Sequence, residues 1–554
     1  MVKDRFLKAM DQMLTRWKKV KEKRIIVNSE INFSPQAIFI SLKHCDFIKI
    51  TGEDGGLTSD PKSSYRLDVS TRVTVAVGDS PDDPKGNGLG ISSSHAFVSP
   101  ENIKALKNVL DKLIDGAFKE SLAEYFGHHS VVSELDIANT RFMKLSNESE
   151  SPVEYFEKEK EFQVNIQKLS EIIEKATQTL HAQKEIEESD IVLSFSRENR
   201  RFAAWEKTVQ GETKKHIFTS QTLGHIVFSA SVRDAGGRLV EYSKRIVTGV
   251  DLETLSQEEK IMKATYELIE MIKQRSNCQV HKSGRYKTVL DSHAVGTLLH
   301  EAGMAHLLSG RYIDEEGATT FKDNIGERIL PNFITIYDDP TIPNGSGSFK
   351  YDEEGVEAQR TVIVEKGVLI NLLHDRISAG RRRTRSNGKA RAEGSKTPEP
   401  RTSNLIVESS ISYPKEKIIQ MMLEDCKKDG DEYGLLIEGG GGEVNVESGE
   451  FRLFPNTVWR IYTDGRREPV SSALFIPLEA LQALNSIKAV SNEKEIVYGV
   501  CGAESGYVPV QEICPAAYVG EIPVHSASDD PPRRRLLPKI KEEDDSADFE
   551  ENDN

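Results

Sequence analysis

Apolar residues follow helical spacing in one part of the N-terminal region and strand spacing in another. The chain should begin with an amphipathic helix over about residues 2–22, on the apolar positions Phe6, Met10, Met13 and Trp17. From Tyr65 to Val77 apolar and polar residues alternate, which predicts a strand that ends at Gly78. Residues 78–88 then have the composition of a loop, and a second helix is expected over about 100–126.

The middle of the chain predicts an exposed helix followed by strands. Residues 155–187 are rich in Glu and Lys, and their apolar positions follow helical spacing: Ile166, Leu169, Ile172 and Ile173. Strands are expected at 191–195 and 226–232, the second leading into a hairpin turn at 234–237. A further helix is predicted at about 257–275.

The block 285–525 has the pattern of short strands and turns, with hairpin tips at Lys366-Gly367 and Asp464-Gly465. We therefore predict an α+β protein. Its parts are an N-terminal α/β region (1–135), a middle mixed region with a long amphipathic helix (136–284), a β-rich C-terminal region (285–525) and a tail (526–554). Residues 542–554 hold eight acids and no base, which predicts a disordered acidic tail.

Composition and charge narrow the class of protein. Lys and Arg number 73 against 88 Asp and Glu, and the net charge of −15 argues against binding nucleic acid or an anionic membrane. No stretch approaches the roughly 18 apolar residues of a membrane span, and the charged N-terminus lacks the apolar segment of a secretory signal. Five widely spaced cysteines without a CxxC do not indicate a disulfide framework. We expect a cytoplasmic protein in a reducing environment.

Residues 292–312 hold the strongest candidate chemistry. His300 and Glu301 pair a candidate metal ligand with a candidate general base, as in zinc hydrolases. His306 lies six residues after His300, so on a regular helix the two would point roughly 120° apart. They could share a metal only if the helix bulges or breaks, and Gly303 is where the backbone could do so. His293, two turns before His300, is too distant to be a ligand. The alternative is a structural helix whose histidines satisfy hydrogen bonds.

A resemblance supports the metal-site hypothesis. LLHEA (298–302) with a downstream His is similar to the active-site helix of the TldD/PmbA family of zinc metallopeptidases, whose pattern is HExxxH. Five further segments resemble that family in the expected order over more than 200 residues: 352–376, 385–391, 400–407, 439–453 and 499–510. The resemblance implies a C-terminal metallopeptidase domain, a Zn²⁺ cofactor, and cleavage of peptides or unfolded polypeptides. The two N-terminal regions resemble the family more faintly.

Carried over by position, His300 is the first zinc ligand, Glu301 the general base and Cys501 the third protein ligand. A cysteine thiolate suits zinc. His306 falls one residue late for the second ligand, and Ala305 occupies the ungapped position. Either the helix absorbs the extra residue and His306 binds the metal, or the metal site is weakened or lost.

The resemblance also implies a substrate site and an assembly. Four glycines, Gly439, Gly440, Gly441 and Gly442, would let a substrate backbone approach closely and pair as an added strand, unless they form an ordinary turn. The family implies a dimer, formed by two copies or with a related subunit, and the net charge leads us to expect no nucleic-acid or membrane partner. The competing hypothesis is a non-catalytic, metal-impaired subunit of such an assembly.

The segment 376–401 carries nine basic residues against Glu393 and Glu399. Three interpretations are open: a mobile loop whose arginines meet substrate carboxylates, a phosphate-binding patch, or a solvated loop. A weaker hypothesis for the whole protein is therefore anion binding through this segment.

Overall fold

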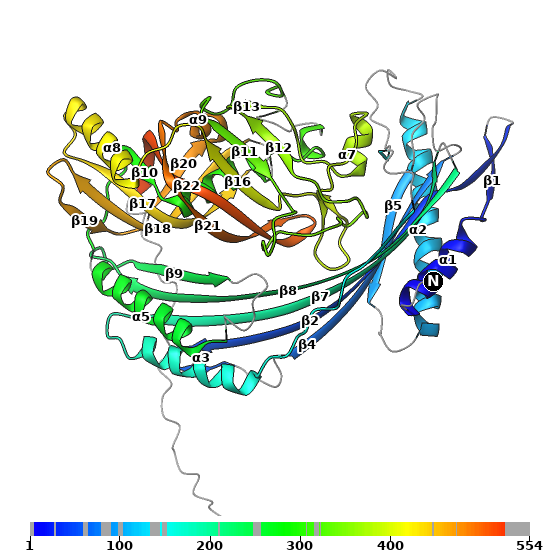
Figure 1. Cartoon of the computed structure of the whole chain (residues 1–554), viewed down its shortest axis with the longest axis horizontal. Coiled ribbons are helices and arrows are strands. Elements are labelled where there is room, and N and C mark those ends of the chain that lie inside the picture. Colours follow the sequence, from blue (N-terminus) through cyan, green and yellow to red (C-terminus); the bar gives the residue numbers. More distant parts are fainter. Residues whose placement is uncertain are drawn as a thin grey trace, which may run out of the picture.

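The computed structural model has two layers, a curved sheet of long strands and a second sheet over its concave side (Figure 1). It describes residues 5–26, 29–58, 65–78, 90–97, 103–132, 145–146, 152–208, 211–247, 256–276, 278–305, 307–314, 321, 323–445, 448–472 and 474–526. The predicted loop at 79–88 and the predicted disordered tail after Ser526 lie outside these residues, as does His306.

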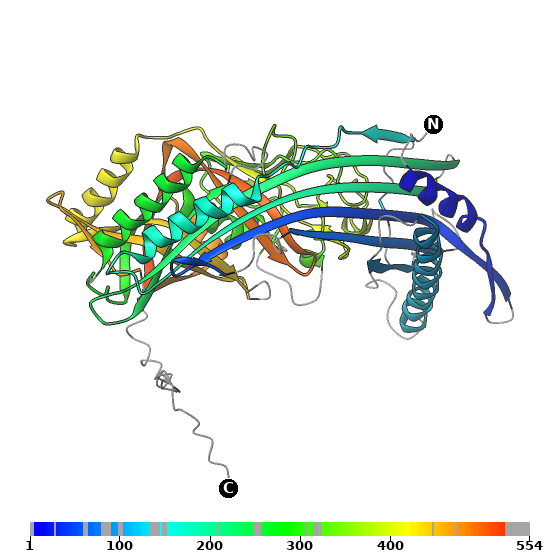
Figure 2. The ribbon, with the colours of Figure 1, turned by 90° about the horizontal axis from the view of Figure 1, so that it is seen from below.

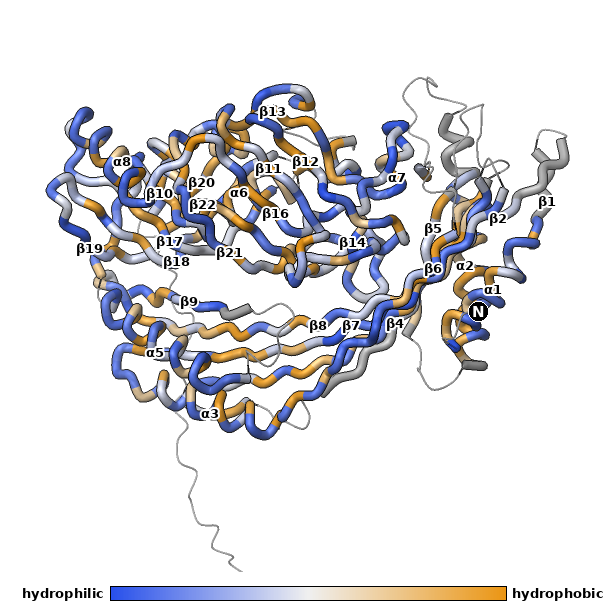
Figure 3. The backbone as a smooth tube through the Cα atoms, in the orientation of Figure 1, coloured by the Kyte–Doolittle hydropathy of each residue, from blue (hydrophilic) through white to orange (hydrophobic). Residues whose placement is uncertain are grey.

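The curved sheet is built mainly from long antiparallel strands. Its described strands run in the order β5 (Gly90–Phe97), β4 (Tyr65–Gly78), β2 (Ser29–Glu53), β7 (Glu188–Thr208), β8 (Gly211–Arg233) and β6 (Val153–Phe156). Short strands extend it, with β1 (Glu22–Ile26) and β3 (Gly56–Leu57) on β2, and β9 (Leu239–Val247) on β8. Hydrophobic and hydrophilic residues alternate along the long strands (Figure 3), so each strand has an apolar and a polar face.

Two pairs of helices cover the apolar face, on the side turned away from the second layer (Figure 2). At one end α1 (Arg5–Trp17) and α2 (Ile103–Val132) pack on the sheet around Met10, Trp17 and Val75. At the other end α3 (Ile166–His181) and α5 (Glu258–Arg275) pack around Ile173 and Leu268. No described helix is long and apolar enough to cross a membrane.

The second layer is a mixed sheet. Its described strands run in the order β10 (Gly284–Leu290), β17 (Tyr433–Val444), β18 (Glu450–Tyr462), β20 (Leu474–Glu479), β22 (Gly506–Ser526), β16 (Asn404–Ser409), β11 (Ile334–Asp338), β12 (Thr361–Glu365) and β13 (Val368–Leu369). β19 (Arg467–Val470) pairs with β18, β21 (Ala489–Ala503) pairs with β22, and β22 also pairs with β10. A separate short pair joins β14 (Ala390–Arg391) and β15 (Glu399–Pro400).

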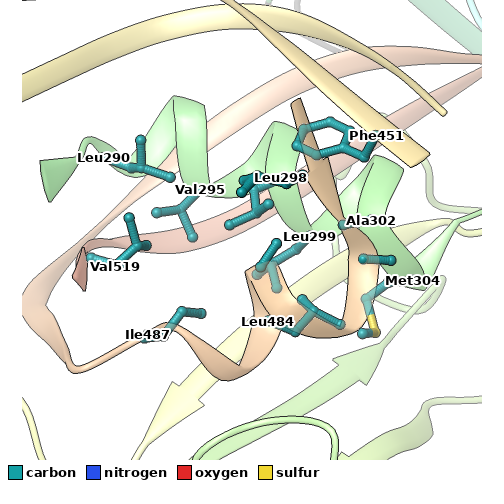
Figure 4. Packing of buried hydrophobic residues seen from close by; sticks show 14 of the residues in the cluster. Leu290, Val295, Leu298, Leu299, Ala302, Met304, Phe451, Leu484, Ile487 and Val519 are labelled. Carbon is teal, nitrogen blue, oxygen red and sulfur yellow. The ribbon is translucent and has the colours of Figure 1, made fainter. Parts of the chain in front are cut away.

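The largest apolar core of the molecule surrounds one helix of this layer, α6 (Ser292–Leu299), and the turn that follows it. Leu298, Leu299 and Ala302 pack near Phe451 of β18 and Leu484 of α9 (Ala480–Asn485), as Figure 4 shows. This burial fixes the position of the polar residues on the opposite side of the same helix. Two further helices of this layer are α7 (Arg376–Arg381) and α8 (Lys415–Asp429).

The α+β fold class is confirmed, and so are the elements with the clearest spacing. Helices occur at 5–17, 166–181 and 258–275, and the predicted strand ends at Gly78. The hairpin tips at Lys366-Gly367 and Asp464-Gly465 are present, with positive φ at Lys366, Gly367 and Gly465.

The strands predicted at 191–195 and 226–232 are much longer in the structure, at 21 and 23 residues. The polar residues that interrupt their apolar pattern do not end them, because these residues bond to the second layer. Arg200 donates to the Tyr351 carbonyl at 2.5 Å, and Lys215 donates to the Gly355 carbonyl at 3.1 Å. Strands from both predicted N-terminal regions lie in one sheet, so the boundary near residue 135 stays a prediction.

Candidate active site

The helix α6 begins at Asp291, which also ties it to the glycine-rich strand. The Asp291 carboxylate accepts hydrogen bonds from the amides of Ala294, at 2.8 Å, and Gly439, at 3.0 Å. The first is an N-cap that satisfies an otherwise unpaired helix amide. Burial raises the pKa of Asp291 against the effect of these two donors. The start of the helix and the strand β17 are therefore held together by one side chain.

The helix widens where the extra residue was predicted. After Leu299 it continues as a π-helix from His300 to Met304, in which the Ala305 amide donates to the His300 carbonyl at 3.1 Å. A second bond of the same kind joins the Leu308 amide to the Gly303 carbonyl at 3.2 Å. A π-turn accommodates one residue more than an α-turn. The π-turn accommodates the extra residue, as the first of the two alternatives requires. The position of His306 lies outside the described residues, so its role as a ligand stays a prediction.

Three segments distant in sequence bring His300, Cys501 and Glu512 together. The Nδ1 atom of His300 lies 2.8 Å from a carboxylate oxygen of Glu512, and both side chains are buried. A hydrogen bond also joins the imidazole to the buried Cys501 side chain. Burial would lower the pKa of His300, but Cys501 and Glu512 outweigh it and hold the pKa well above 6.5. A carboxylate on one ring nitrogen leaves the other nitrogen oriented for a metal.

This set of donors fits zinc. Imidazole nitrogen and cysteine sulfur are ligands that zinc prefers. In such sites a carboxylate usually accepts a hydrogen bond from the ring nitrogen of the histidine that does not bind the metal. No group of three histidine, cysteine or acidic side chains with metal-site geometry occurs among the described residues. The described part of the chain therefore supplies two of the three ligands implied by the resemblance, and His306 would be the third.

The four glycines lie within β17 rather than in a turn, and they let this strand pass close to α6. A Cβ atom on Gly442 would lie 2.9 Å from Cγ of Glu301 and 2.8 Å from Cγ2 of Thr297. The Thr297 hydroxyl donates to the Gly440 carbonyl at 3.1 Å. Gly439 and Gly440 have φ values of 63° and 130°, which other residues rarely adopt. At Gly441 a Cβ would meet no atom within 4 Å.

A cavity of about 940 Å³ lies in front of these residues, and both layers line it. One side comes from β9 and α5, and the other from α6, the glycines of β17 and the strand β21. We call it the site cavity. His300 and Glu301 line it, together with three exposed apolar side chains: Ile496 (52% exposed), Val500 (47%) and Phe454 (42%). Apolar walls with a few convergent polar groups are typical of a ligand site.

Two buried arginines hold the β21–β22 hairpin that carries Cys501. Arg391 donates to the carbonyls of Thr402 and Pro509, both at 2.7 Å, and Pro509 lies opposite Val500 in the hairpin. Arg401 donates to the Ser505 hydroxyl at 2.8 Å and to the Gly506 carbonyl at 3.0 Å, at the hairpin tip. These contacts fix the strand on which Cys501 lies.

Much of the basic segment 376–401 is therefore not a loop open to solvent or to anions, and the interpretations that required this are wrong for its buried residues. Arg376, Lys389, Arg391 and Arg401 are buried. Lys389 forms an ion pair with Asp338 at 2.6 Å, and Arg376 pairs with Glu206 at 2.7 Å. The physical reason is that these cations satisfy carbonyls and carboxylates between the packed segments of the C-terminal layer and the long strands.

A second cavity of about 810 Å³ lies on the other side of the hairpin, lined by Tyr507, Val508 and Pro509 together with the long strands. Its central acid is Glu353, which pairs with Lys43 at 2.7 Å and Arg200 at 3.1 Å. These cations and Arg72 outweigh burial and lower the pKa of Glu353 to about 2.

The sequence indicated His300, Glu301, Cys501 and the glycines, and in the structure His300, Glu301 and the glycines line the site cavity, with Cys501 buried against His300. The sequence did not indicate Glu512 or Asp291. Glu512 lies 212 residues after His300 in the middle of a strand, and no local spacing connects the two. Asp291 could have been found, because an Asp just before a helical pattern is a capping signal.

The comparisons with known proteins match the C-terminal part of the chain to a metallopeptidase domain. Residues 283–526 match the PmbA/TldA metallopeptidase C-terminal domain. A metalloprotease of Methanocaldococcus jannaschii is 34% identical over 228 residues, 41% of this chain and 48% of that protein. A metalloprotease of Archaeoglobus fulgidus is 29% identical over 320 residues, 57% of this chain and 69% of that protein. The first match thus spans about half of the relative's length.

Solved structures resemble the chain over most of its length. TldE from Thermococcus kodakarensis has a TM-score of 0.64 at 16% identity, covering 94% of this chain and 100% of that one. A putative modulator of a DNA gyrase from Thermotoga maritima has a TM-score of 0.62 at 17% identity, with the same coverage. At these identities the likeness shows the fold alone. The match over residues 283–526 identifies this part of the chain as a domain of the PmbA/TldA metallopeptidase type.

Proposed function

We propose that the protein is a zinc-dependent endopeptidase that cleaves peptides or unfolded polypeptides. The observation that carries the proposal is the convergence of Cys501 and Glu512 on His300, which lines the site cavity together with Glu301. The metalloprotease names of the relatives, one of them a zinc metalloprotease TldD homolog of Saccharolobus solfataricus, support the same activity.

His300 and Cys501 would hold the zinc ion, with His306 as the third protein ligand. Bound zinc would supply Lewis-acid chemistry, making a water molecule more acidic and polarising the substrate carbonyl. Glu512 would keep the His300 ring oriented through the bond to Nδ1, so that Nε2 is the donor.

Glu301 would act as general base. Its carboxylate lines the cavity next to His300, so it would take a proton from the attacking water and deliver it to the leaving amine nitrogen. Gly441 leaves open space above the strand, where the backbone of an extended substrate would lie without steric hindrance. Contacts through the backbone give little sequence preference, which suits unfolded substrates.

The assembly belongs to the same proposal. We propose a dimer, formed by two copies or by this chain with a related subunit, in the cytoplasm. Size-exclusion chromatography with light scattering of the purified chain decides between a self-associating chain and one that needs another subunit.

The test is zinc content beside peptidase activity. Protein purified without chelator is analysed by mass spectrometry for zinc per chain, and a denatured protein is supplied as substrate. We expect about one zinc in the parent protein and in Glu301→Gln, loss of zinc in His306→Ala and Cys501→Ala, and cleavage by the parent but by none of these three variants. Cys514→Ala is the matched control, because Cys514 is equally buried but lies in the apolar core.

Cleavage retained by Glu301→Gln would exclude this residue as the base. A parent protein with neither zinc nor activity would instead favour the non-catalytic subunit, and a related subunit recovered with it would support that reading. Zinc retained in His306→Ala would show that the third ligand is a residue other than His306.

A further inference from the structure

One cation on the β9 side of the site cavity has no partner among the described residues. Arg245 lies opposite Val227 in the β8–β9 pairing, and both line the cavity. Glu241, Ser243 and Arg245 alternate along β9, so they share the face turned toward the cavity. The Arg245 side chain is exposed on this face, the surrounding protein still lowers the pKa of its guanidinium by partial desolvation, and no acid acts against that effect. A guanidinium without a carboxylate here is an available binding group.

The two other cations of the same cavity, Lys244 and Arg275, have partners among the described residues. Lys244 forms an ion pair with Glu267, and Glu512 bonds to His300. Arg275, only 4% exposed, stacks over the Trp459 ring at 4.8 Å and donates to the Met271 carbonyl at 3.1 Å.

Two acids of the cavity are engaged as well. Asp291 caps α6, and Glu438 accepts hydrogen bonds from the Trp459 indole, at 2.9 Å, and the Thr457 hydroxyl, at 3.1 Å. Glu241 and Glu495 are further acids that line the same cavity. Arg245 therefore differs from the other described cations of the cavity, Lys244 and Arg275, in having no partner among the described residues.

The position of Arg245 relative to the site is fixed. The Asn456 side chain accepts from the Ser243 amide at 3.1 Å and donates to the Ser243 carbonyl at 2.9 Å, which joins β9 to β18. Arg245 follows two residues later, about 7 Å along the strand. Burial lowers the pKa of His293 in the first turn of α6; Glu512 opposes this effect, and the charge of Arg245 adds to it.

The distance from this point to the reacting centre corresponds to a few residues of substrate. His293 and His300 are seven residues apart, about 10 Å along the helix. An extended peptide rises about 3.4 Å per residue, so it covers that distance in about three residues.

We propose that Arg245 binds a carboxylate of the peptide substrate about three residues from the bond that is cleaved. The inference rests on the proposed peptidase function and names the substrate class of the same cavity. Guanidinium groups bind carboxylates through paired hydrogen bonds, with a geometry that an amide does not match. The carboxylate is either the C-terminus of the peptide or an Asp or Glu side chain.

The experiment compares matched peptides on the zinc-loaded full chain. Internally quenched peptides without other charges are made with a free C-terminal carboxylate or a C-terminal amide. A second set carries Glu or Gln at each position from one to five residues from the scissile bond. We expect KM to be about tenfold lower for the carboxylate near the third residue. Arg245→Gln should abolish the difference, and Arg245→Lys should keep part of it. Lys244→Gln, which removes a cation already paired with Glu267, should preserve it.

A preference confined to the free C-terminus identifies the terminal carboxylate, and a preference for internal Glu identifies the side chain. Equal KM values for both members of every pair, or a preference that survives in Arg245→Gln, would overturn the inference. If no peptide is cleaved, the proposed function fails, and fluorescence anisotropy with labelled peptides on Glu301→Gln still tests Arg245. Equal Kd values for carboxylate and amide forms would then reject it, and a difference that depends on Arg245 would support it.

Discussion

The β21–β22 hairpin separates two cavities of similar size, about 940 Å³ and 810 Å³, that differ in how their charges are used. In the second cavity Glu353 is surrounded by cations, and Lys43, Arg200 and Lys396 all form ion pairs within the protein. In the site cavity an imidazole, a thiol and a carboxylate converge, and Arg245 has no described partner.

Because the two cavities are similar in volume but differ in how their charged groups are paired, volume alone does not identify a functional site in this fold. Ion pairs between the layers stabilise the position of one sheet on the other and leave few groups for a ligand. At the site cavity, an imidazole and a thiol instead come together as ligands of the type that zinc prefers, and a carboxylate is bonded to the imidazole. Three predictions test this difference between the two cavities.

The largest effect is expected from the glycine strand of the site cavity. Gly442→Ala places a methyl group against Glu301 and Thr297 and should displace the general base, lowering kcat about 10- to 100-fold. Gly441→Ala meets no protein atom, so it should raise KM if a substrate backbone lies there, with kcat largely retained. Steady-state kinetics on one quenched peptide measure both variants. Equal losses of kcat in the two would show that the glycines act only through the stability of the strand.

A smaller effect is expected from the hairpin between the cavities. Arg401→Lys keeps the charge, but a single ammonium group cannot hold both Ser505 and Gly506 in the same geometry. We expect zinc affinity to fall about tenfold, measured by competition with a chromophoric chelator, while thermal unfolding shows that the chain remains folded. Arg385→Lys, on an exposed position of the same basic segment, is the matched control. Unchanged zinc affinity in Arg401→Lys would separate the hairpin contacts from the metal site.

The smallest effect concerns stability next to the second cavity. Burial, together with the charges of Asp375 and Asp352, raises the pKa of Glu354 to about 8, while Arg311 opposes this shift. A carboxyl group whose pKa is higher in the folded chain stabilises the fold below its ordinary value of 4.5, and this stability is lost as pH rises through 8.

The slope from this single group is at most about 1.4 kcal/mol per pH unit between these values. Glu354→Gln cannot titrate, so its free energy of unfolding should decline less between pH 5 and 8 than that of the parent protein. Denaturant unfolding at four pH values measures the difference. Parallel pH profiles for the two proteins would contradict the assignment.

The sequence predicted elements well where one face of the element is buried against the sheet. Helices α1, α3 and α5 bury one apolar stripe each, so their spacing shows in the residues. The lengths of β7 and β8 could not be predicted, because residues such as Arg200 and Lys215 are satisfied only by carbonyls of the second layer. Local patterning contains no information about those partners.

In the candidate site too, the residues with a local sequence pattern could be predicted and those that depend on distant partners could not. His300, Glu301 and Cys501 were found because their neighbours form recognisable segments. Glu512 was not, since its role arises only when β22 passes beside α6. The buried use of Arg391 and Arg401 was also missed, because a basic, glycine-containing segment has the composition of a surface loop whether or not it is packed.

The widened turn at His300–Met304 has a consequence for how such a helix tolerates a change in length. An inserted residue in a regular α-helix rotates everything that follows by about 100° and turns a buried face outward. Here the π-turn confines the insertion to one turn, and Leu307 and Leu308 remain in the core beyond it. The length of this turn is therefore free to vary while the flanking helix and core stay in phase. A search for related sites that requires a fixed spacing between the two histidines would pass over chains that have made the same insertion.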